Sequence, residues 1–213
     1  MKRGFPTYRE ITKEFYEHNA AEYAANTAHM GDAEWLTRFA ALLPAGGRVL
    51  DVGCAAGRDS QWFVQNGFEV VGIDIAPTFI VMARRHVPEA IFHEMGVEDL
   101  TFADESFDGV WCSCVLIHLS KESVREAVQQ MLRVLKPGGV LYILVEAGGG
   151  EGIEADPRYG GSEKYSSYYN EDELRSILDG AALISLTTVD KAVDTYRAPD
   201  RIFILARRRG SQR

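Results

Sequence analysis

Residues 49–60 read VLDVGCAAGRDS, and the interpretation of the whole chain starts from this stretch. The apolar residues before Gly53 are typical of a buried strand, and only small residues lie between Gly53 and Gly57. A strand that runs through a glycine-rich turn into a helix presents backbone N–H groups to a ligand at the helix N-terminus. The stretch therefore predicts a nucleotide-type site, although a glycine-rich corner can also be purely structural.

A carboxylate follows a second apolar run at an informative distance. Residues 68–74 read FEVVGID and end in Asp74, roughly 20 residues after the glycine turn, where a doubly wound sheet places an acid that accepts both ribose hydroxyls. Dinucleotide binders and S-adenosylmethionine binders share this spacing. A dinucleotide fingerprint needs Gly-x-Gly-x-x-Gly, whereas the order from Gly53 is Gly-x-Ala-x-Gly followed by Arg58. An NAD(P)-dependent oxidoreductase is therefore the alternative, and an S-adenosylmethionine site is the first hypothesis.

Four motifs together resemble class I S-adenosylmethionine-dependent methyltransferases of the small-molecule type. Residues 51–57, DVGCAAG, resemble the acid-x-Gly-x-Gly-x-Gly turn of that family, with Ala55 in place of the middle glycine. Asp74 resembles its ribose-binding acid. Residues 106–112, SFDGVWC, resemble its fourth-strand motif, and residues 133–139, RVLKPGG, resemble its turn before strand five. The motifs occur in the family's order, and the resemblance covers nearly the whole chain.

This resemblance implies an α/β fold with a doubly wound seven-stranded sheet, mostly parallel with the last strand antiparallel, helices on both faces and an N-terminal helical cap. One domain is expected over residues 1–213. Its expected parts are the cap, the cofactor-binding core, a lid, and a C-terminal helix with a strand hairpin, at residues 1–45, 46–147, 148–169 and 170–213. The lid is predicted as a long irregular loop, because it holds six glycines and four tyrosines without periodicity.

The resemblance also implies S-adenosylmethionine as the cofactor and S-adenosylhomocysteine as the product. The methionine portion is assigned to the glycine turn, the ribose to Asp74, and the adenine to residues that follow the next strands. The other assigned residues are Gly53, Ala55 and Gly57, Asp51 for water or the ammonium group, Arg58 for the carboxylate or the acceptor, Ile75 and Val97 as adenine walls, and the Cys112 carbonyl for the adenine amino group. A surface salt bridge is the structural alternative for Arg58.

One position departs from the family's pattern at the adenine end. Gly96 stands where the family usually has an aspartate that receives the adenine amino group. Backbone groups at Gly96 and Val97, or a displaced Glu98, must then substitute for that aspartate. Together with Ala55, this departure keeps a second alternative open, a protein that holds S-adenosylmethionine without turnover.

His118 is the titratable base expected beyond the end of the fourth strand, where doubly wound sheets bind their ligands. A neutral imidazole can remove a proton from an acceptor hydroxyl near physiological pH, and a hydrogen bond to nearby backbone is the structural alternative. The resemblance makes Tyr23 a second candidate catalytic residue that closes over the cofactor. The candidate acceptor contacts are Tyr16, Glu146, Tyr165 and Tyr168. Oxygen is the favoured acceptor atom, with nitrogen, sulfur and carbon open.

Composition narrows the class of partner. The 213 residues contain 23 Lys plus Arg against 31 Asp plus Glu, a net charge of −8, which repels phosphate backbones and favours a small-molecule acceptor over nucleic acid. No apolar run reaches the roughly 18 residues of a membrane span, and no signal-peptide core follows the first residues, so we expect a cytoplasmic protein. Cys54, Cys112 and Cys114 lack zinc-site spacing and are expected to be reduced, with no metal required. A monomer or homodimer is expected.

Overall fold

The computed structural model describes residues 7–29, 32–189 and 200–210. The helices are α1 (Tyr8–Thr27), α2 (Ala33–Ala40), α3 (Arg58–Gln65), α4 (Pro77–His86), α5 (Val124–Val134) and α6 (Glu171–Ile177). The strands are β1 (Arg48–Val52), β2 (Glu69–Asp74), β3 (Ile91–Glu94), β4 (Phe107–Ser113), β5 (Leu135–Glu146), β6 (Glu151–Asp156), β7 (Ser162–Ser167), β8 (Ala181–Val189) and β9 (Arg201–Arg208). Three short 3-10 turns are η1 (Val97–Asp99), η2 (Leu116–His118) and η3 (Pro157–Tyr159).

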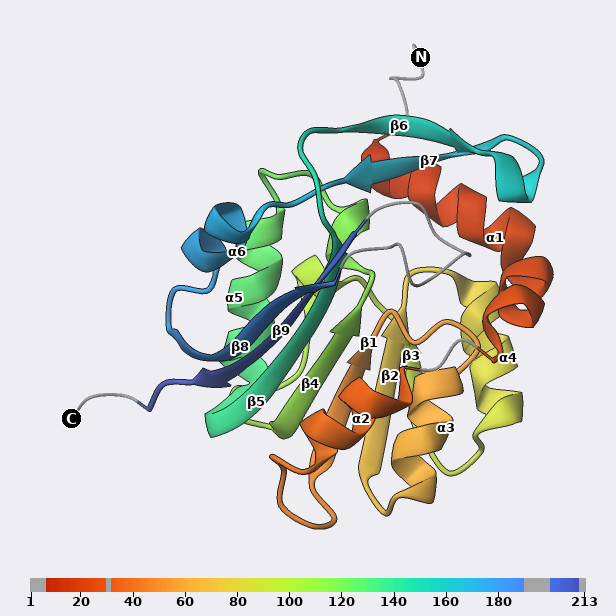
Figure 1. Ribbon diagram of the computed structural model, residues 1–213. Helices are drawn as coiled ribbons and strands as arrows, with labels where there is room; N and C mark the ends of the chain where they lie inside the picture. The colour runs from red at the N-terminus through yellow and green to blue at the C-terminus, as the bar shows by residue number, and fades with distance from the viewer. Residues whose placement is uncertain (1–6, 30–31, 190–199, 211–213) are drawn as a thin grey trace.

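Seven strands form one sheet in the order β3-β2-β1-β4-β5-β9-β8 (Figure 1). Strands β1 to β5 pair in parallel, and β9 is antiparallel to both of its neighbours, β5 and β8. The predicted doubly wound sheet with an antiparallel last strand is therefore confirmed. The strand order reverses between β1 and β4, and the crevice outside the carboxyl ends of these strands is where such sheets bind ligands.

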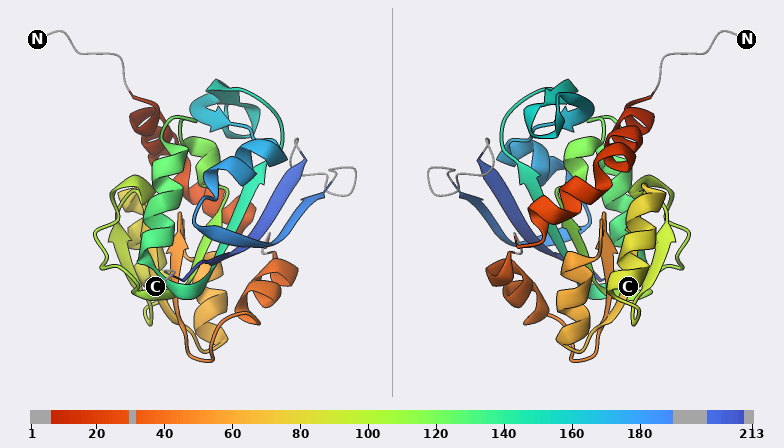
Figure 2. Two further views of the ribbon diagram at one scale, coloured as in Figure 1. Left: turned by 90° about the vertical axis from the view of Figure 1, so that its left-hand side faces the viewer. Right: turned by 90° about the vertical axis from the view of Figure 1, so that its right-hand side faces the viewer.

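Helices cover both faces of the sheet, as the edge-on views in Figure 2 show. On one face, Trp35 and Phe39 of α2 and Phe63 of α3 pack against Trp111 and Tyr142 of the sheet. On the other face, α5 and α6 bury apolar side chains in the larger core cluster. Because both faces are covered, a central strand is buried on both sides, which explains the continuous apolar run at residues 140–145 of β5.

Residues 148–169 do not form the irregular loop that the sequence predicts. They contain β6 and β7, which pair as an antiparallel hairpin, with Gly160 and Gly161 in its turn at positive φ. Figure 1 shows this hairpin lying against α1. Tyr159 is 5% exposed, and its ring packs edge-on against Phe15 of α1 at 5.3 Å between centroids. The tyrosines attributed to a mobile lid therefore include a residue that anchors the hairpin to α1.

Ion pairs within the hairpin support this docking. Asp156 is 4% exposed and lies 2.5 Å from Arg158 and 3.0 Å from Lys164. Burial alone would raise the pKa of this carboxyl, but the hydrogen bonds from Arg158 and Lys164 outweigh burial and hold the pKa well below its ordinary value. The ammonium group of Lys164 also lies 5.6 Å from the Phe15 ring, so the same network reaches α1.

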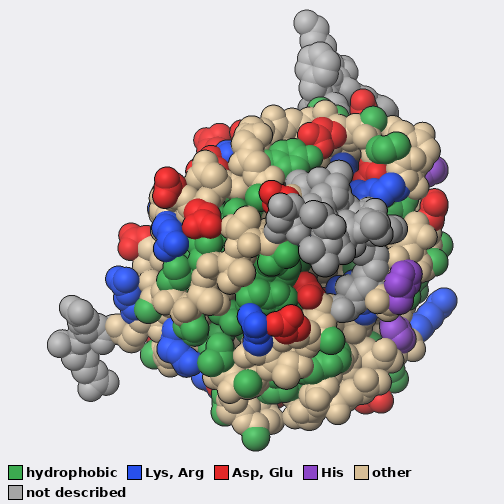
Figure 3. Space-filling model, in the orientation of Figure 1, with side chains coloured by type: hydrophobic (Ala, Val, Ile, Leu, Met, Phe, Trp, Pro, Cys, Tyr) green, Lys and Arg blue, Asp and Glu red, His purple; other side chains and the backbone are tan. Residues whose placement is uncertain are grey.

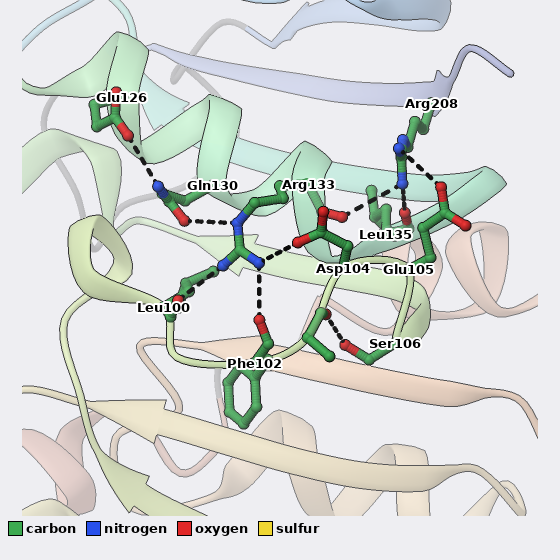
Figure 4. A network of polar contacts seen from close by, with 11 residues as sticks. Leu100, Phe102, Asp104, Glu105, Ser106, Glu126, Gln130, Arg133, Leu135 and Arg208 are labelled. Carbon is green, nitrogen blue, oxygen red and sulfur yellow. Dashed lines mark hydrogen bonds and ion pairs between the residues drawn. The ribbon is translucent and has the colours of Figure 1, made fainter. Parts of the chain in front are cut away.

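At the end of the sheet where β4 and β5 begin, Arg133 of α5 connects several segments through hydrogen bonds (Figure 4). Its guanidinium donates to the carbonyls of Leu100 and Phe102 at 2.8 Å each, to Asp104 at 2.6 Å and to Gln130 at 3.0 Å. These bonds fix residues 100–106, which lead into β4. Arg208 of β9 extends the network by donating to the carbonyls of Arg133 and Leu135 and to Glu105.

Among the residues that the structure describes, none of the helices has both the length and the apolar character needed to cross a membrane. Acidic and basic side chains are interspersed over the face of the molecule shown in Figure 3.

Candidate functional site

Asp74 lies at the carboxyl end of β2 and lines a cavity together with Gly53, Ile75 and His118. Its two carboxylate oxygens accept the backbone N–H of Ala55 at 3.0 Å and that of Ala76 at 2.9 Å, so the carboxylate is oriented from both sides. Burial raises the pKa of Asp74 to about 6, and the backbone N–H donors oppose this rise. We call this space the Asp74 cavity. The predicted ribose acid is therefore placed at a cavity and held in one orientation.

The glycines of the turn play two different parts. Gly53 lines the Asp74 cavity at φ 68°, and a Cβ atom there would overlap Val115. Gly57 was predicted to contact the cofactor, but it lines neither cavity. A Cβ atom at this position would press on Ala83 and Val87 at 3.2 to 3.4 Å. Gly57 therefore allows the start of α3 to pack closely against α4.

Ala55 adopts the left-handed conformation, φ 46°, that its replacement of a glycine implies. The backbone N–H of Ala55 donates to Asp74, and Ala55 lines both cavities. The conformation is uncommon for a residue with a Cβ atom and costs on the order of 1 kcal/mol. The turn therefore adopts at Ala55 a backbone conformation that glycine favours.

Helix α1 covers the Asp74 cavity with side chains spaced along one of its faces. Tyr8, Thr12, Tyr16 and Tyr23 all line the cavity. The ring of Tyr16 lies edge-on to that of Tyr23 at 5.2 Å between centroids, and both contact Phe79 of α4. Thr12 is 2% exposed, and its hydroxyl has no hydrogen-bond partner among the described residues. A buried hydroxyl of this kind is the signature of a polar group that a ligand or water completes.

His118 lies at the end of η2, is 8% exposed and also lines the Asp74 cavity. Its Nδ1 is 2.8 Å from the carbonyl oxygen of Tyr165, and its Nε2 is 2.7 Å from the hydroxyl of Tyr16. A carbonyl can only accept, so in a neutral ring Nδ1 carries the hydrogen and Nε2 accepts from Tyr16. The arrangement orients an imidazole lone pair of His118 toward the Tyr16 hydroxyl of α1.

A second cavity lies beside the first, and Arg58, Asp51 and Asp59 line it. We call it the Arg58 cavity. Arg58 forms a bidentate pair with Asp59 at 2.7 and 3.0 Å and donates to the Thr27 carbonyl at 3.2 Å. The salt-bridge alternative is thus observed, but the pair is largely buried, with the Asp59 side chain 9% exposed. Tyr23, Gly53 and Ala55 line both cavities.

Asp51 is 2% exposed and accepts a hydrogen bond from the Ser60 hydroxyl at 2.6 Å. Burial raises the pKa of Asp51 to about 8, and the nearby carboxylate of Asp59 adds to this rise. The residue lines the Arg58 cavity, so it is positioned to face a cationic group there. A bound cation would favour the ionised carboxylate.

Of three residues predicted to contact the adenine, one lies outside both cavities and two line the Asp74 cavity. Cys112 is fully buried within β4, paired with Val52 and Ile143, and lines neither cavity, whereas the next residues, Ser113 and Cys114, line both. The fourth strand therefore reaches the site one residue later than predicted. Ile75 and Val97 line the Asp74 cavity as expected.

The predicted acceptor contacts also differ from the observed cavity linings. Glu146 pairs with Arg201 across β5 and β9, and Tyr168 donates to Glu154 within the hairpin. Neither residue lines the two cavities. Tyr165 contributes its carbonyl to His118 rather than a cavity-lining side chain. The hairpin therefore acts on the site through His118 and α1.

The sequence interpretation missed the first turns of α1. Tyr8, Arg9 and Thr12 line the Asp74 cavity. Glu98 of η1, which the sequence offers as a substitute for the family's aspartate, lines this cavity as well. The available signal was the spacing of Tyr8, Thr12 and Tyr16, four residues apart, which places them on one helix face. Asp59 was also missed. It accepts from the Trp111 indole at 3.0 Å, and neither side chain alone gave a motif.

Comparison with known proteins agrees with this geometry. Residues 50–143 match a family model described as a methyltransferase domain. A Bacillus subtilis protein named as a methyltransferase, YqeM, is 31% identical over 137 residues, which are 62% of this chain and 56% of that protein. The ubiquinone biosynthesis O-methyltransferase of Xanthomonas axonopodis pv. citri is 38% identical over 109 residues, 49% of this chain and 45% of the relative. The chain thus spans about half the length of these curated relatives.

Among solved structures, an S-adenosylmethionine-dependent methyltransferase from Methanosarcina mazei superposes with a TM-score of 0.72 at 22% identity, over 80% of this chain and 96% of that chain. The sheet order, the glycine turn and the acid at the end of β2 define the class I methyltransferase fold. Residues 50–143 thus match a methyltransferase domain, and the chain has the fold of S-adenosylmethionine-dependent methyltransferases.

Proposed function

We propose that this protein transfers a methyl group from S-adenosylmethionine to a small-molecule acceptor, with oxygen the favoured acceptor atom. One observation carries the proposal: Asp74, the glycine turn and the oriented imidazole of His118 all line one cavity at the carboxyl ends of the strands. A nucleoside site and a proton acceptor are thereby combined. The aromatic rings of Tyr16, Tyr23 and Phe79 beside them suit a planar or apolar acceptor.

The residues at the two cavities fit S-adenosylmethionine. Asp74 is free to accept ribose hydroxyls with its remaining lone pairs, and the unsatisfied hydroxyl of Thr12 offers a polar contact. Ile75 and Val97 supply apolar walls for a base, while Asp51 faces the space suited to the methionine ammonium group. When bound, this cofactor supplies a methyl group on a sulfonium, whose displacement leaves a neutral thioether.

The protein's own contribution is positioning, exclusion of water and removal of a proton. The proton of an acceptor hydroxyl reaches His118 through Tyr16: the Tyr16 hydroxyl donates its own proton to Nε2 at 2.7 Å and takes the proton of the acceptor oxygen in exchange. The Tyr165 carbonyl holds the Nδ1 hydrogen and stabilises the imidazolium that results. Helix α1 with Tyr23 closes the cavity above these groups.

The test measures binding first and turnover second. Isothermal titration with S-adenosylhomocysteine is expected to give saturable binding to the wild type and at least about 100-fold weaker binding to Asp74→Ala, because two hydrogen bonds to a charged group are lost. Glu94→Ala is the matched control, since it removes a carboxylate from the end of the adjacent strand β3, outside the cavity lining. Equal affinity of wild type and Asp74→Ala would contradict the ribose assignment.

Turnover is then measured as S-adenosylhomocysteine formed from S-adenosylmethionine in the presence of phenols, catechols, carboxylic acids, amines and thiols. Product is expected with at least one hydroxyl acceptor. Binding of NAD(P) but not of S-adenosylhomocysteine would reinstate an oxidoreductase. Binding without product from any acceptor class would instead favour a protein that holds the cofactor without turnover.

A further inference from the structure

The exposed apolar side chains of this protein concentrate on one strand. Among the residues that the structure describes, six large hydrophobic side chains are exposed, and three of them, Leu183, Ile184 and Val189, belong to β8 at 38%, 44% and 42% exposure. Strand β8 is an edge of the seven-stranded sheet and pairs with β9 on one side. Its other side therefore presents backbone N–H and C=O groups with which another strand can pair.

Strand β8 lacks the features by which sheet edges are ordinarily protected. Its nine residues, Ala181–Val189, include no charged residue and no proline, whereas the opposite edge strand β3 has four residues and ends in Glu94. A register shift between Leu183 and Ser185 interrupts β8 once, and residues 185–189 pair regularly with β9 beyond it. A long uncharged edge in a chain of net charge −8 favours a second strand that covers it.

The charged side chains beside β8 differ between its two ends. Glu171 of α6 accepts a hydrogen bond from the Thr188 hydroxyl at 2.8 Å, so an acid lies beside the last residues of the strand. Arg175, one turn further along α6, lines a groove beside the first residues of β8 together with Arg209 and Asp179. Two arginines against one aspartate make this groove basic. The strand therefore has a basic end and an acidic end.

This distribution of charge suits an antiparallel pair of two β8 strands. Glu171 and Arg175 are 3.6 Å apart within one chain and about half exposed, so both remain accessible to the charges of a second molecule. A twofold axis places the first residues of one strand beside the last residues of the other, so each basic end meets an acidic end. A parallel pair would instead bring like charges together.

The apolar side chains of β8 suit the same arrangement. With the twofold axis at Leu186, Leu183 of one copy lies close to Val189 of the second copy. The axis repeats this contact, so four apolar side chains that are exposed in one copy alone leave water together.

We propose that β8 pairs in antiparallel orientation with β8 of a second copy of this chain, so that two seven-stranded sheets join into one continuous sheet in a homodimer. Both copies contribute the same surface, as a closed twofold dimer requires. None of the residues of β8 lines the Asp74 cavity or the Arg58 cavity, so the interface leaves both accessible. Dimerisation through β8 is therefore independent of the proposed function.

Analytical ultracentrifugation of the full chain tests the oligomeric state and the interface together. The wild type is expected to sediment with twice the monomer mass at about 100 µM. Leu183→Lys and Val189→Lys are each expected to weaken the dimer at least about 10-fold, because a charge replaces an apolar contact at two equivalent places. Ile91→Lys is the matched control. It changes an isoleucine that is 53% exposed on the opposite edge strand β3, and it is expected to leave the dissociation constant unchanged.

The charges at the two ends of β8 test the antiparallel orientation. Glu171→Arg places a base opposite Arg175 of the second copy and is expected to weaken the dimer about 3- to 10-fold. Combining Glu171→Arg with Arg175→Glu exchanges the two charges in both copies and is expected to return the dissociation constant to within about 3-fold of the wild type. A double variant that dimerises as weakly as Glu171→Arg alone would contradict the antiparallel arrangement.

Other outcomes would overturn the β8 interface itself. A wild type that stays monomeric at about 100 µM would exclude the dimer. A dimer that both β8 lysine variants leave intact, or that Ile91→Lys dissociates, would place the interface elsewhere. Melting curves of the lysine variants are expected to match that of the wild type, because the substituted positions are exposed. S-adenosylhomocysteine is expected to bind the monomeric variants as it binds the wild type, so failure of either proposal leaves the other standing.

Discussion

The two ends of the sheet satisfy their polar groups in opposite ways. At the end where β4 and β5 begin, Arg133 donates to two carbonyls, a carboxylate and an amide, and Arg208 continues the network. At the end where β1 and β2 finish, Thr12 has a buried hydroxyl without a partner among the described residues, and the carboxyl of Asp51 is buried at a cavity. One end is completed by the protein itself, and the other is left to be completed by ligands.

The largest effect is expected at the ligand end, from His118→Gln. The initial rate of S-adenosylhomocysteine formation with a hydroxyl acceptor is expected to fall about 100- to 1000-fold, because general-base catalysis contributes on the order of 10² to 10⁴. Affinity for S-adenosylhomocysteine is expected to stay within about 3-fold, since binding does not need the proton acceptor. Tyr16→Phe, which removes the hydroxyl but keeps the ring, is the companion variant. A rate unchanged by His118→Gln would reduce this residue to a structural role.

Arg133→Met tests the other end. Removing the guanidinium leaves the carbonyls of Leu100 and Phe102 unpaired and is expected to lower the free energy of unfolding by about 3 kcal/mol. For a domain of this size the melting temperature then falls by about 6 to 12 °C. Calorimetry measures the change, and Arg125→Met, at an exposed position of the same helix, is the control. Weakened S-adenosylhomocysteine binding below the melting range would show that the two ends are coupled.

Asp51→Asn tests the ligand end of the sheet through the pH dependence of the protein's stability. The pKa of Asp51 is raised to about 8 in the folded protein, from an ordinary value near 4. The folded state therefore holds this proton more tightly, and the stability it contributes is full below about pH 4 and is lost as pH rises through about 8. The asparagine variant is expected to melt within about 2 °C of the wild type at pH 5 and roughly 3 to 8 °C above it at pH 9.

The matched substitution for this pH series is Asp179→Asn, at an exposed position after α6. Its melting temperature is expected to follow the wild type at both pH values. Parallel profiles for Asp51→Asn and the wild type would mean that the Asp51 carboxyl is not the source of the pH dependence.

The smallest effect is expected from Ala55→Gly. Glycine adopts φ 46° without a Cβ penalty, so the variant is expected to be more stable by about 0.5 to 1 kcal/mol, or about 1 to 4 °C. Ala56→Gly, next to it and outside the positive-φ positions, is expected to lose a similar amount. A destabilised Ala55→Gly variant would show that the left-handed alanine carries no strain.

The fold could be predicted from the sequence because each element has a local signal. The glycine turn after β1, the proline at the start of α4 and the capping box of Asn170 and Glu173 at α6 lie within a few residues of the structure that they determine. The hairpin of β6 and β7 was missed because its strands hold few apolar residues and alternate weakly. Its stability comes from docking Tyr159 on α1, a contact between distant parts of the chain.

The site was predictable where a single side chain carries the signal. Asp74 and His118 both line the Asp74 cavity, since each follows a strand end at a known place in the topology, and their roles stay predictions. Cys112 was wrong by one residue because the last hydrogen-bonded position of β4 depends on pairing with both neighbouring strands. The contact between Tyr8 and Glu98, 90 residues apart, has no signal in either segment alone.

Trp111 gives the molecule an internal optical reporter. Its indole stacks on Tyr142 at 3.7 Å and donates to Asp59, the partner of Arg58 at the wall of the second cavity. A ligand that rearranges this ion pair alters the surroundings of the indole and therefore its emission. Because the chain has three tryptophans, Trp35→Phe and Trp62→Phe together leave Trp111 as the sole indole emitter, so occupancy can be followed in solution without a label.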